Sequence, residues 1–489
     1  MTGQTIQLIL VVINRHVVFK EVHMDKSLSK SISYFGLIAL GAGGVIGSSW
    51  IYTNSKFFAM YGAGGEIYGL MVAAALAILV SLSFAELSTI FTKAGGEVVY
   101  GSAAFGKKGA LFAGWALVGA YISTMAFYVT ASSMLISTIF PQIASGPYYE
   151  FAGVKVHFTE LALGIGITLF VFIINYFGAK ITGNIQIILF IGLIVLGVAL
   201  ITVGFTQGSV SNFTPAFSEH MNKSSSIFRF ILPGMTFLTG WESVAIMAEE
   251  ANVPARKIGL VVIISIVIAA AYYILVLMSS AWVYPWEKTA TMEMGTISAF
   301  KAAGFPILSI AAYTISFLGL ATSFLTFFSS APRLIFSLAR QNVLPSYFNH
   351  VHPKYHTPTR ALWATLVLVL GLGWLGKGAV VYFLDMGGFL VALAWSFNAL
   401  CLRKIRKAHP ELVGKFRNKH LFWPTLGGAI ALIIALATVI PGTLVSLVWP
   451  YEYVILGAWI VIGLVCYFIT RKTDEPVETE IEQLTQRTD

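Results

Sequence analysis

The sequence predicts an all-α membrane protein with about twelve transmembrane helices. Of its 489 residues, 57% are apolar and only 11% are charged, whereas a soluble domain carries about 25% charged residues. Many apolar runs reach the roughly 18–20 residues that cross about 30 Å of hydrocarbon as a helix. Because a helix satisfies its own backbone hydrogen bonds, it is the element that lipid favours.

The distribution of charge is the third observation that supports this fold class. If the N-terminus is cytoplasmic and twelve spans alternate, 24 of the 31 Lys and Arg residues fall on the cytoplasmic side, as the positive-inside rule expects. The net charge of +9 is therefore assigned to the cytoplasmic membrane face, and no nucleic acid partner is expected. We predict a multi-pass protein of the cell inner (cytoplasmic) membrane with both termini cytoplasmic. The seven cations left outside are Lys56, Lys155, Lys223, Arg229, Lys288, Lys301 and Lys377.

The ends of the predicted helices are set by charged and turn-forming residues that bound the apolar runs. The predicted spans are 33–61, 66–91, 109–140, 158–177, 182–205, 228–250, 258–284, 305–339, 361–376, 379–402, 421–446 and 451–470.

The first predicted span contains a cluster of glycine and serine, Gly41-Ala-Gly-Gly-Val-Ile-Gly-Ser-Ser-Trp50. Each glycine costs about 1 kcal/mol in a helix relative to alanine, so the cluster favours a break. Backbone groups freed at membrane depth are tolerated only where they line a cavity or bind a ligand. The alternative is close helix packing through Gly43 and Gly47.

A second break is expected in the sixth span, which contains Pro233-Gly-Met-Thr-Phe-Leu-Thr-Gly-Trp-Glu-Ser243. Glu242 lies beside Gly240 near mid-span, where an ionisable group is costly and by default functional. In the alternative interpretation, Glu242 only pairs with a polar neighbour.

Interrupted helices at positions one and six are what two inverted five-helix repeats would produce. Half-helix N-termini then face anionic substrate groups, and unwound carbonyls receive cations. The predicted division of the chain is a cytoplasmic segment 1–31, a first repeat 32–206, a second repeat 227–402, two further helices in 420–471 and a cytoplasmic tail 472–489.

Motifs of soluble enzymes and of ATP-driven pumps are missing, so an enzyme is not expected. Cys401 and Cys466 show no metal or redox spacing. His350, His352 and His356 are a weak metal candidate, because they lie in an ordinary basic turn. No cofactor is therefore predicted, apart from a possible Na⁺ as coupling ion.

Four segments resemble the amino acid, polyamine and organocation (APC) transporter superfamily, in its bacterial amino acid permease type. They are Gly44-Val-Ile-Gly-Ser-Ser49, Ala85-Glu-Leu-Ser with Ala94-Gly-Gly-Glu-Val-Val-Tyr100, Thr239-Gly-Trp-Glu-Ser with Ala248-Glu-Glu-Ala-Asn-Val-Pro-Ala-Arg256, and Arg333-Leu-Ile-Phe-Ser-Leu-Ala-Arg-Gln-Asn-Val-Leu-Pro345. The resemblance implies a LeuT-like fold with broken helices 1 and 6 and two peripheral C-terminal helices. It also implies secondary active amino acid transport by alternating access.

The resemblance further implies a substrate site at the two breaks. The substrate carboxylate would accept N–H bonds from Ser48 and Ser49, and Gly47 would allow its approach. Ser49 stands where glycine is usual, with Trp50 behind it, and this departure affects the size and orientation of the substrate. The amino group would meet carbonyls of Val45, Thr236 and Thr239 near Gly240, and the aromatic residues that shape or close the pocket would be Phe237, Trp241 and Phe327.

Two residue sets compete for the coupling ion. Gly319, Thr322 and Ser323 resemble the helix 8 pattern that sodium-coupled transporters of this fold use with helix 1 carbonyls, here those of Gly43 and Ile46. The alternative is that both hydroxyls only bond back to the preceding turn. Proton coupling through Glu242 also stays open, because burial favours the neutral form of a carboxylate.

An amine or polyamine transporter and an amino acid exchanger of the same fold remain alternatives. A channel or a transporter-like receptor is disfavoured, since two different broken helices in one chain do not suggest a symmetric pore. The expected partners are a small-molecule substrate, amino acid or amine, and the lipid bilayer. The protein is expected to be a monomer or a homodimer.

Overall fold

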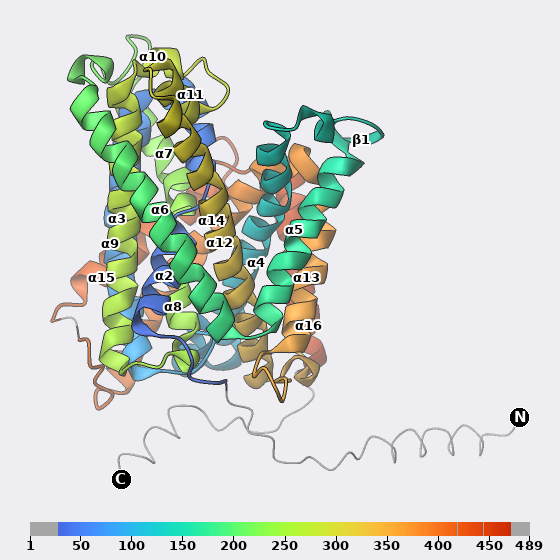
Figure 1. Ribbon diagram of the computed structural model, residues 1–489. Coiled ribbons are helices and arrows are strands. Elements are labelled where there is room, and N and C mark those ends of the chain that lie inside the picture. Colours follow the sequence, from blue (N-terminus) through green and yellow to red (C-terminus); the bar gives the residue numbers. More distant parts are fainter. Residues whose placement is uncertain (1–27, 418, 444, 471–489) are drawn as a thin grey trace, which may run out of the picture.

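A computed structural model describes residues 28–470, except residues 418 and 444. This part of the chain folds into a bundle of helices (Figure 1). Nine of its helices are long and apolar enough to cross a membrane, and two shorter apolar helices accompany them. The all-α membrane class is therefore confirmed, whereas the number of twelve spans and the two five-helix repeats stay predictions.

Four helices, α2, α3, α7 and α8, are described below together with the two helix breaks. The other α-helices are α4 (Glu97–Ser137), α5 (Phe158–Tyr176), α6 (Ala179–Gln207), α9 (Ala255–Val283), α10 (Trp286–Thr289), α11 (Gly295–Ala302), α12 (Pro306–Arg340), α13 (Thr359–Gly373), α14 (Val380–Ala408), α15 (Phe422–Val439) and α16 (Tyr451–Thr470).

The first helix is broken where the glycine and serine cluster predicts. Helix α2 (Tyr34–Val45) ends before Ile46, and α3 (Ser49–Ile90) begins three residues later. In the gap, the Gly47 N–H donates to the Val45 carbonyl at 2.7 Å, which closes a tight turn. This segment, Ile46–Ser48, is called the first break.

Two glycines interrupt the helical backbone close to predicted boundaries. The spans 33–61 and 66–91 were expected to be separate, and α3 is interrupted between them at Gly62, whose φ of 73° is not helical. In α4, Gly106 (φ 66°) separates a first part, which begins at Glu97 and was not predicted, from the part that corresponds to the predicted span 109–140. Glycine adopts a positive φ at little cost, so the chain changes direction at these points without a loop.

The sixth span is interrupted more severely than a single helix over 228–250 would allow. Helix α7 (Lys223–Phe237) contains Pro233, and only one turn, α8 (Ser243–Ile246), follows before a 3-10 turn at Ala248–Glu250. The second break is Leu238–Glu242, with Gly240 at φ 130°. The expected interruption is thus present, five residues after the proline.

The second break touches the last turn of α2, directly before the first break. A β-carbon on Gly240 would lie 2.8 Å from the carbonyl carbon and oxygen of Gly44 and 2.9 Å from the Val45 nitrogen. Only glycine permits this approach. Helix α2 packs against α6, α9 and α12 around this crossing, which therefore lies inside the bundle.

The two ends of the bundle differ. One end carries α10, α11 and the hairpin of β1 (Tyr148–Phe151) and β2 (Val154–His157), which was not predicted (Figure 1). We call it the hairpin end. The opposite end, called the Glu249 end, holds the start of the described chain, since Leu28 N–H donates to Glu249 at 2.9 Å.

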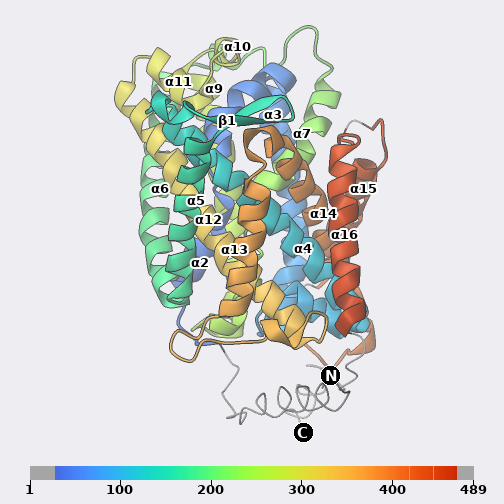
Figure 2. The same cartoon turned by 90° about the vertical axis from the view of Figure 1, so that its right-hand side faces the viewer.

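The last two helices lie at the periphery, as predicted. Helix α15 packs on α3 and α14, and α16 contacts α4 and α14. Figure 2 shows the pair at one edge of the bundle. Most of α16 is exposed, which leaves its surface to the surrounding lipid.

Candidate substrate site

The first break is held by a tyrosine from α9. The Tyr273 hydroxyl donates to the Val45 carbonyl at 2.7 Å and accepts from the Gly47 N–H at 2.8 Å. Trp50 adds a second contact, because its indole Nε1 donates to the Gly47 carbonyl at 2.7 Å. The Trp50 ring is fully buried edge-on against Tyr272 and Tyr273. These contacts fix the shape of the turn.

Hydroxyl groups surround Gly47. A β-carbon at this position would lie 3.2 Å from the Tyr128 hydroxyl and 3.5 Å from the Ser323 hydroxyl. The Ser48 and Ser323 hydroxyls are buried and have no hydrogen-bond partner within the described ranges. Buried polar groups are normally paired, so these two hydroxyls are candidate contacts for a ligand at the first break.

The second break contains one fully buried carboxylate, Glu242. One oxygen accepts the Gly240 N–H at 2.7 Å, and the other accepts the indole N–H of Trp395 on α14. Glu242 therefore has two hydrogen-bond donors and, in the part of the chain that is described, no ion pair. Its carboxylate is held in place at the break rather than neutralised by a cation.

The predicted aromatic residues belong to three separate groups of rings. Phe237 packs with Phe57, Phe230 and Tyr273, and Phe327 packs with Tyr121 and Tyr128. Trp241 packs against Phe84 and Trp395. The three residues therefore do not form one stack.

Two of the three carbonyls predicted to bind the substrate amino group already accept hydrogen bonds within the protein. Val45 O already accepts from Gly47 N–H and from Tyr273. Thr236 O accepts the Thr239 N–H at 3.3 Å, while the Thr239 hydroxyl bonds back to Met235 O at 3.0 Å. Ser49 begins α3 directly after the first break.

Four of the five residues proposed for a cation come together where α12 crosses the first break. The Thr322 hydroxyl lies 3.0 Å from Gly319 O and 3.5 Å from Ile46 O, and Ser323 is adjacent to it. Gly319 packs on the break itself, since a β-carbon there would be 3.1 Å from Ile46 O. A β-carbon on Gly43 would point toward Gln186 and Phe190 of α6.

Several site residues were missed by the sequence analysis. Gln186 on α6 donates through Nε2 to Ala39 O, Thr322 O and Thr326 Oγ1 at 3.0–3.2 Å, which ties α2 to α12. Tyr121 and Tyr128 are seven residues apart on one face of α4, and this spacing was the available signal. The sequence signal for Tyr273 was weaker, because it is only a tyrosine within an apolar helix.

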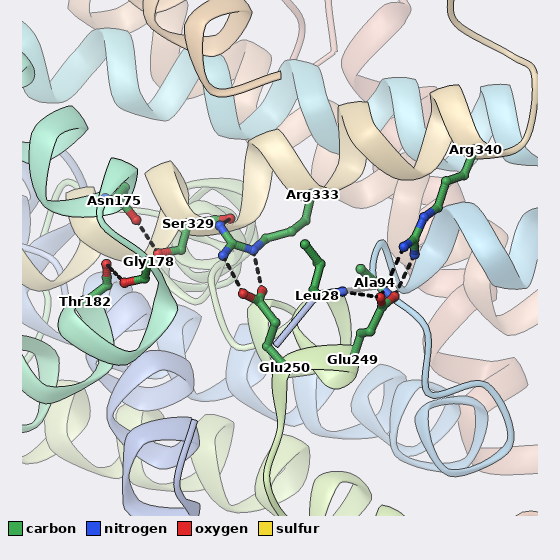
Figure 3. Close-up of polar contacts among 10 residues, drawn as sticks. All are labelled: Leu28, Ala94, Asn175, Gly178, Thr182, Glu249, Glu250, Ser329, Arg333 and Arg340. Carbon is green, nitrogen blue, oxygen red and sulfur yellow. Dashed lines mark hydrogen bonds and ion pairs between the residues drawn. The ribbon is translucent and has the colours of Figure 1, made fainter. Parts of the chain in front are cut away.

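A network of two ion pairs closes the bundle at the Glu249 end (Figure 3). Arg333 binds both oxygens of Glu250, at 2.6 and 2.8 Å, and both side chains are buried. Arg340 forms a second bidentate ion pair, in which its guanidinium lies 2.7 and 3.2 Å from the two oxygens of Glu249. We call these four residues the closing network; it joins the end of α12 to the turn that follows the second break.

Glu249 also accepts two backbone N–H groups, from Leu28 and from Ala94, each at 2.9 Å (Figure 3). Burial alone would raise the pKa of Glu249, but the hydrogen bond and charge of Arg340 and the two N–H donors outweigh it and lower the pKa. The carboxylate is thus charged and joins three segments that are distant in sequence.

The described residues contain no group of three or more His, Cys, Asp or Glu side chains that could hold a metal ion. In the histidine turn, His352 Nδ1 accepts the N–H groups of Lys354 and Tyr355. His350 Nδ1 contacts the Thr359 hydroxyl instead. This arrangement is that of an ordinary turn.

Comparison with known proteins places these features in one family. The family model "Amino acid permease" matches residues 32–465. The branched-chain amino acid permease BcaP of Lactococcus lactis is 24% identical over 459 residues, which cover 91% of this chain and 95% of the permease. The methylthioribose transporter of Bacillus subtilis is 25% identical, with 91% and 94% covered. The glutamate/serine transporter AimA of the same organism is 24% identical, with 78% and 72% covered. With a matching family model over most of its length, two helices broken at the predicted positions and a polar crossing between them, this chain belongs to the amino acid permease family.

Proposed function

We propose that this protein is a secondary active transporter that binds a neutral, apolar amino acid where the two helix breaks cross, and that it moves the amino acid by alternating access. The observation that carries the proposal is the contact of Gly240 with Gly44 and Val45, next to the unpaired Ser48 and Ser323 hydroxyls. A small polar site inside an apolar bundle suits a solute that is itself small and polar.

The polarity of the broken helices supports a zwitterionic substrate. The N-terminus of α3 and the C-terminus of α7 both end at the crossing. A helix N-terminus carries a partial positive charge and a C-terminus a partial negative one. A substrate carboxylate would therefore bind at Ser48 and Ser49, and its ammonium group would bind toward Thr239. A decarboxylated amine would leave the α3 terminus without an anion.

The side chain of the substrate is inferred from the walls of the site. The walls are aromatic, formed by Phe237, Phe327, Tyr121 and Tyr128, and they favour an apolar group. The relatives are named for different substrates, namely branched-chain amino acids, methylthioribose and glutamate or serine, so the choice of an apolar side chain rests on these aromatic residues. All of the polar groups come from one chain, so a monomer would suffice for binding.

Proton coupling through Glu242 is the first candidate for the driving force. A fully buried carboxylate without a cationic partner is costly when charged, so its protonation and the occupancy of the neighbouring site should influence each other. The Gly240 N–H links the two directly, because it belongs to the same break and donates to Glu242.

Sodium coupling is a second candidate, and a separate observation supports it. The Ser323 hydroxyl has no hydrogen-bond partner among the described residues, and Thr322 Oγ1 lies 3.0 Å from Gly319 O and 3.5 Å from Ile46 O. Oxygen ligands of this kind suit a hard cation. The two candidates use different residues, so an experiment can separate them.

Alternating access would require the closing network to open. If most of the Lys and Arg residues lie on the cytoplasmic side, the Glu249 end is cytoplasmic, and the conformation described here is closed toward the cytoplasm. Arg333–Glu250 and Arg340–Glu249 then act as the inner gate. Substrate release to the cytoplasm would separate α12 from the turn after the second break.

The proposal is tested by uptake of radiolabelled amino acids and amines into proteoliposomes that contain the purified full chain. Three conditions are compared: an inward proton gradient, an inward Na⁺ gradient and no gradient. Accumulation of neutral amino acids with protons supports Glu242, and accumulation with Na⁺ supports the Thr322 and Ser323 site. Uptake only into preloaded vesicles would make the protein an exchanger, and no uptake of any amino acid would reject the proposal.

A further inference from the structure

A groove on the outside of the bundle lies between α4, α14 and α16. It encloses a volume of about 270 Å³. Its walls are apolar and aromatic, including Phe112 on α4, Phe389 on α14 and Ile460 on α16, and its single charged lining residue is Lys108. In a chain that spans the membrane, such a groove faces lipid.

The inner wall of the groove is rigid. Trp115 and Trp459 stack with ring centroids 4.3 Å apart and an interplanar angle of 10°. Each indole N–H donates to the backbone carbonyl of the other residue, at 2.9 and 3.2 Å. Gly463 and Gly119 make room for the rings, since a β-carbon on either would lie 2.5 Å from an indole nitrogen. With its polar atoms paired internally, this wall presents only apolar surface.

Lys108 stands at one end of the groove, two residues after the kink of α4 at Gly106. Its side chain is exposed and forms no ion pair within the described part of the chain. The lining residues of α4 run from Lys108 to Ala116, which is about 12 Å along a helix at 1.5 Å per residue. A cation at one end and an apolar channel below it match the shape of a lipid with an anionic headgroup.

The cation lies at the Glu249 end of the bundle. Ser102, on the segment of α4 before the kink, donates to Gln341 at the end of α12, and Thr470 at the end of α16 donates to Val343 O. In the orientation proposed above, this is the cytoplasmic leaflet, which carries anionic lipids that attract Lys and Arg near the membrane surface.

We propose that the groove between α4, α14 and α16 binds one anionic phospholipid, with its phosphate at Lys108 and an acyl chain against the Trp115–Trp459 pair. The lipid would fill the space between the peripheral helix α16 and the helices that carry the substrate site. The inference does not depend on transport, since it uses residues that have no role at the helix breaks.

The test is native mass spectrometry of the purified full chain with phosphatidylglycerol or with phosphatidylcholine of the same acyl chains. The expected result is that phosphatidylglycerol is retained at least threefold more than phosphatidylcholine. Lys108→Gln should abolish this preference, while Lys107→Gln, which removes the neighbouring lysine outside the groove, should leave it unchanged. Equal retention of the two lipids by the unmodified chain, or an unaltered preference in Lys108→Gln, would overturn the proposal.

A second variant tests the apolar part of the groove. Ile460 is half exposed, so Ile460→Trp should fill the groove without disturbing the fold and should lower the retention of both lipids. Ile460→Cys then examines the competing occupant, a second copy of this chain. Efficient cross-linking between two copies through this cysteine in liposomes would show a dimer interface and reject the lipid site.

Discussion

Tyr273 of α9 closes the turn at Gly47, accepting a hydrogen bond from its N–H and donating one to the carbonyl of Val45 two residues earlier. The first break is therefore not a free stretch of backbone. Its shape is set by a side chain from another helix, and movement of α9 relative to α2 would change the geometry that the substrate meets.

Tyr273→Phe should weaken substrate binding while leaving the protein folded. It removes two hydrogen bonds with a net value of about 1 kcal/mol each, so the KM for uptake should rise by up to roughly thirtyfold. The matched control is Tyr272→Phe, which removes a single bond of 3.2 Å to Leu193 O away from the break. Equal effects of the two variants would show that Tyr273 acts only through general packing.

Glu242→Gln should remove the pH dependence of uptake if Glu242 carries the coupling proton. The amide stays neutral at every pH, so an inward proton gradient should no longer drive accumulation, whereas exchange of labelled for unlabelled substrate should continue. Measurement of both activities in the same proteoliposomes checks this. Glu66→Gln is the control, because Glu66 is also fully buried but lies in α3 outside both breaks. A proton-driven accumulation that persists in Glu242→Gln would reject the role.

Ser323→Ala should abolish stimulation by Na⁺ if α12 provides the cation site. The control is Ser330→Ala on the same helix, since both hydroxyls are buried and lack a hydrogen-bond partner in the described ranges. Uptake is compared at equal osmolarity in Na⁺ and in choline. The sodium hypothesis fails if Ser323→Ala keeps the sodium dependence of the unmodified chain.

Arg340→Gln should favour opening at the Glu249 end. Arg340 is partly exposed, but its partner Glu249 is buried, so its loss leaves the Glu249 carboxylate with only its two backbone N–H donors. An unpaired buried charge costs about 3–5 kcal/mol, and this cost should weaken the closed arrangement. Buried Cys401 serves as the reporter in a Cys466→Ser background. Maleimide labelling of Cys401 should become several-fold faster. Glu249→Gln should produce the same increase, and unchanged labelling in both variants would argue against a gate.

Gly240→Ala should destabilise the contact between the two breaks. A side chain at φ 130° is strained by about 1–3 kcal/mol, and the β-carbon would collide with Gly44. The expected outcome is a lower Tm and loss of uptake. Gly457→Ala on α16, where no atom lies within 4 Å of the added carbon, should change neither quantity.

The sequence was informative where local chemistry decides the structure. The glycines around Gly47 and at Gly240 predicted both interruptions, because helix propensity is a property of nearby residues. Gly62 and Gly106, where a positive φ produces a kink inside α3 and α4, lie close to the predicted boundaries at 61 and 109. Glycine alone does not distinguish a kink from a break.

The candidate site was predicted less completely, since its contacts join residues that are far apart in the chain. Gln186 reaches Thr326, 140 positions away, and Tyr273 reaches Val45, 228 positions away. No local pattern encodes such partners. The roles of Phe237 and Phe327 in substrate binding stay predictions, and only the fold reveals that Phe237 packs with Tyr273 and Phe327 with Tyr121.

The start of the described chain is attached to the turn that follows the second break. Ser31 and Ile32 donate to Glu250 O, Asn252 donates back to Ile32 O, and Leu28 donates to Glu249. These hydrogen bonds couple the position of the segment just before α2 to that of the segment just after α8. A fusion partner or affinity tag placed close to residue 28 would therefore disturb the hydrogen bond between Leu28 and Glu249. The placement of an expression tag should thus alter the proposed gate.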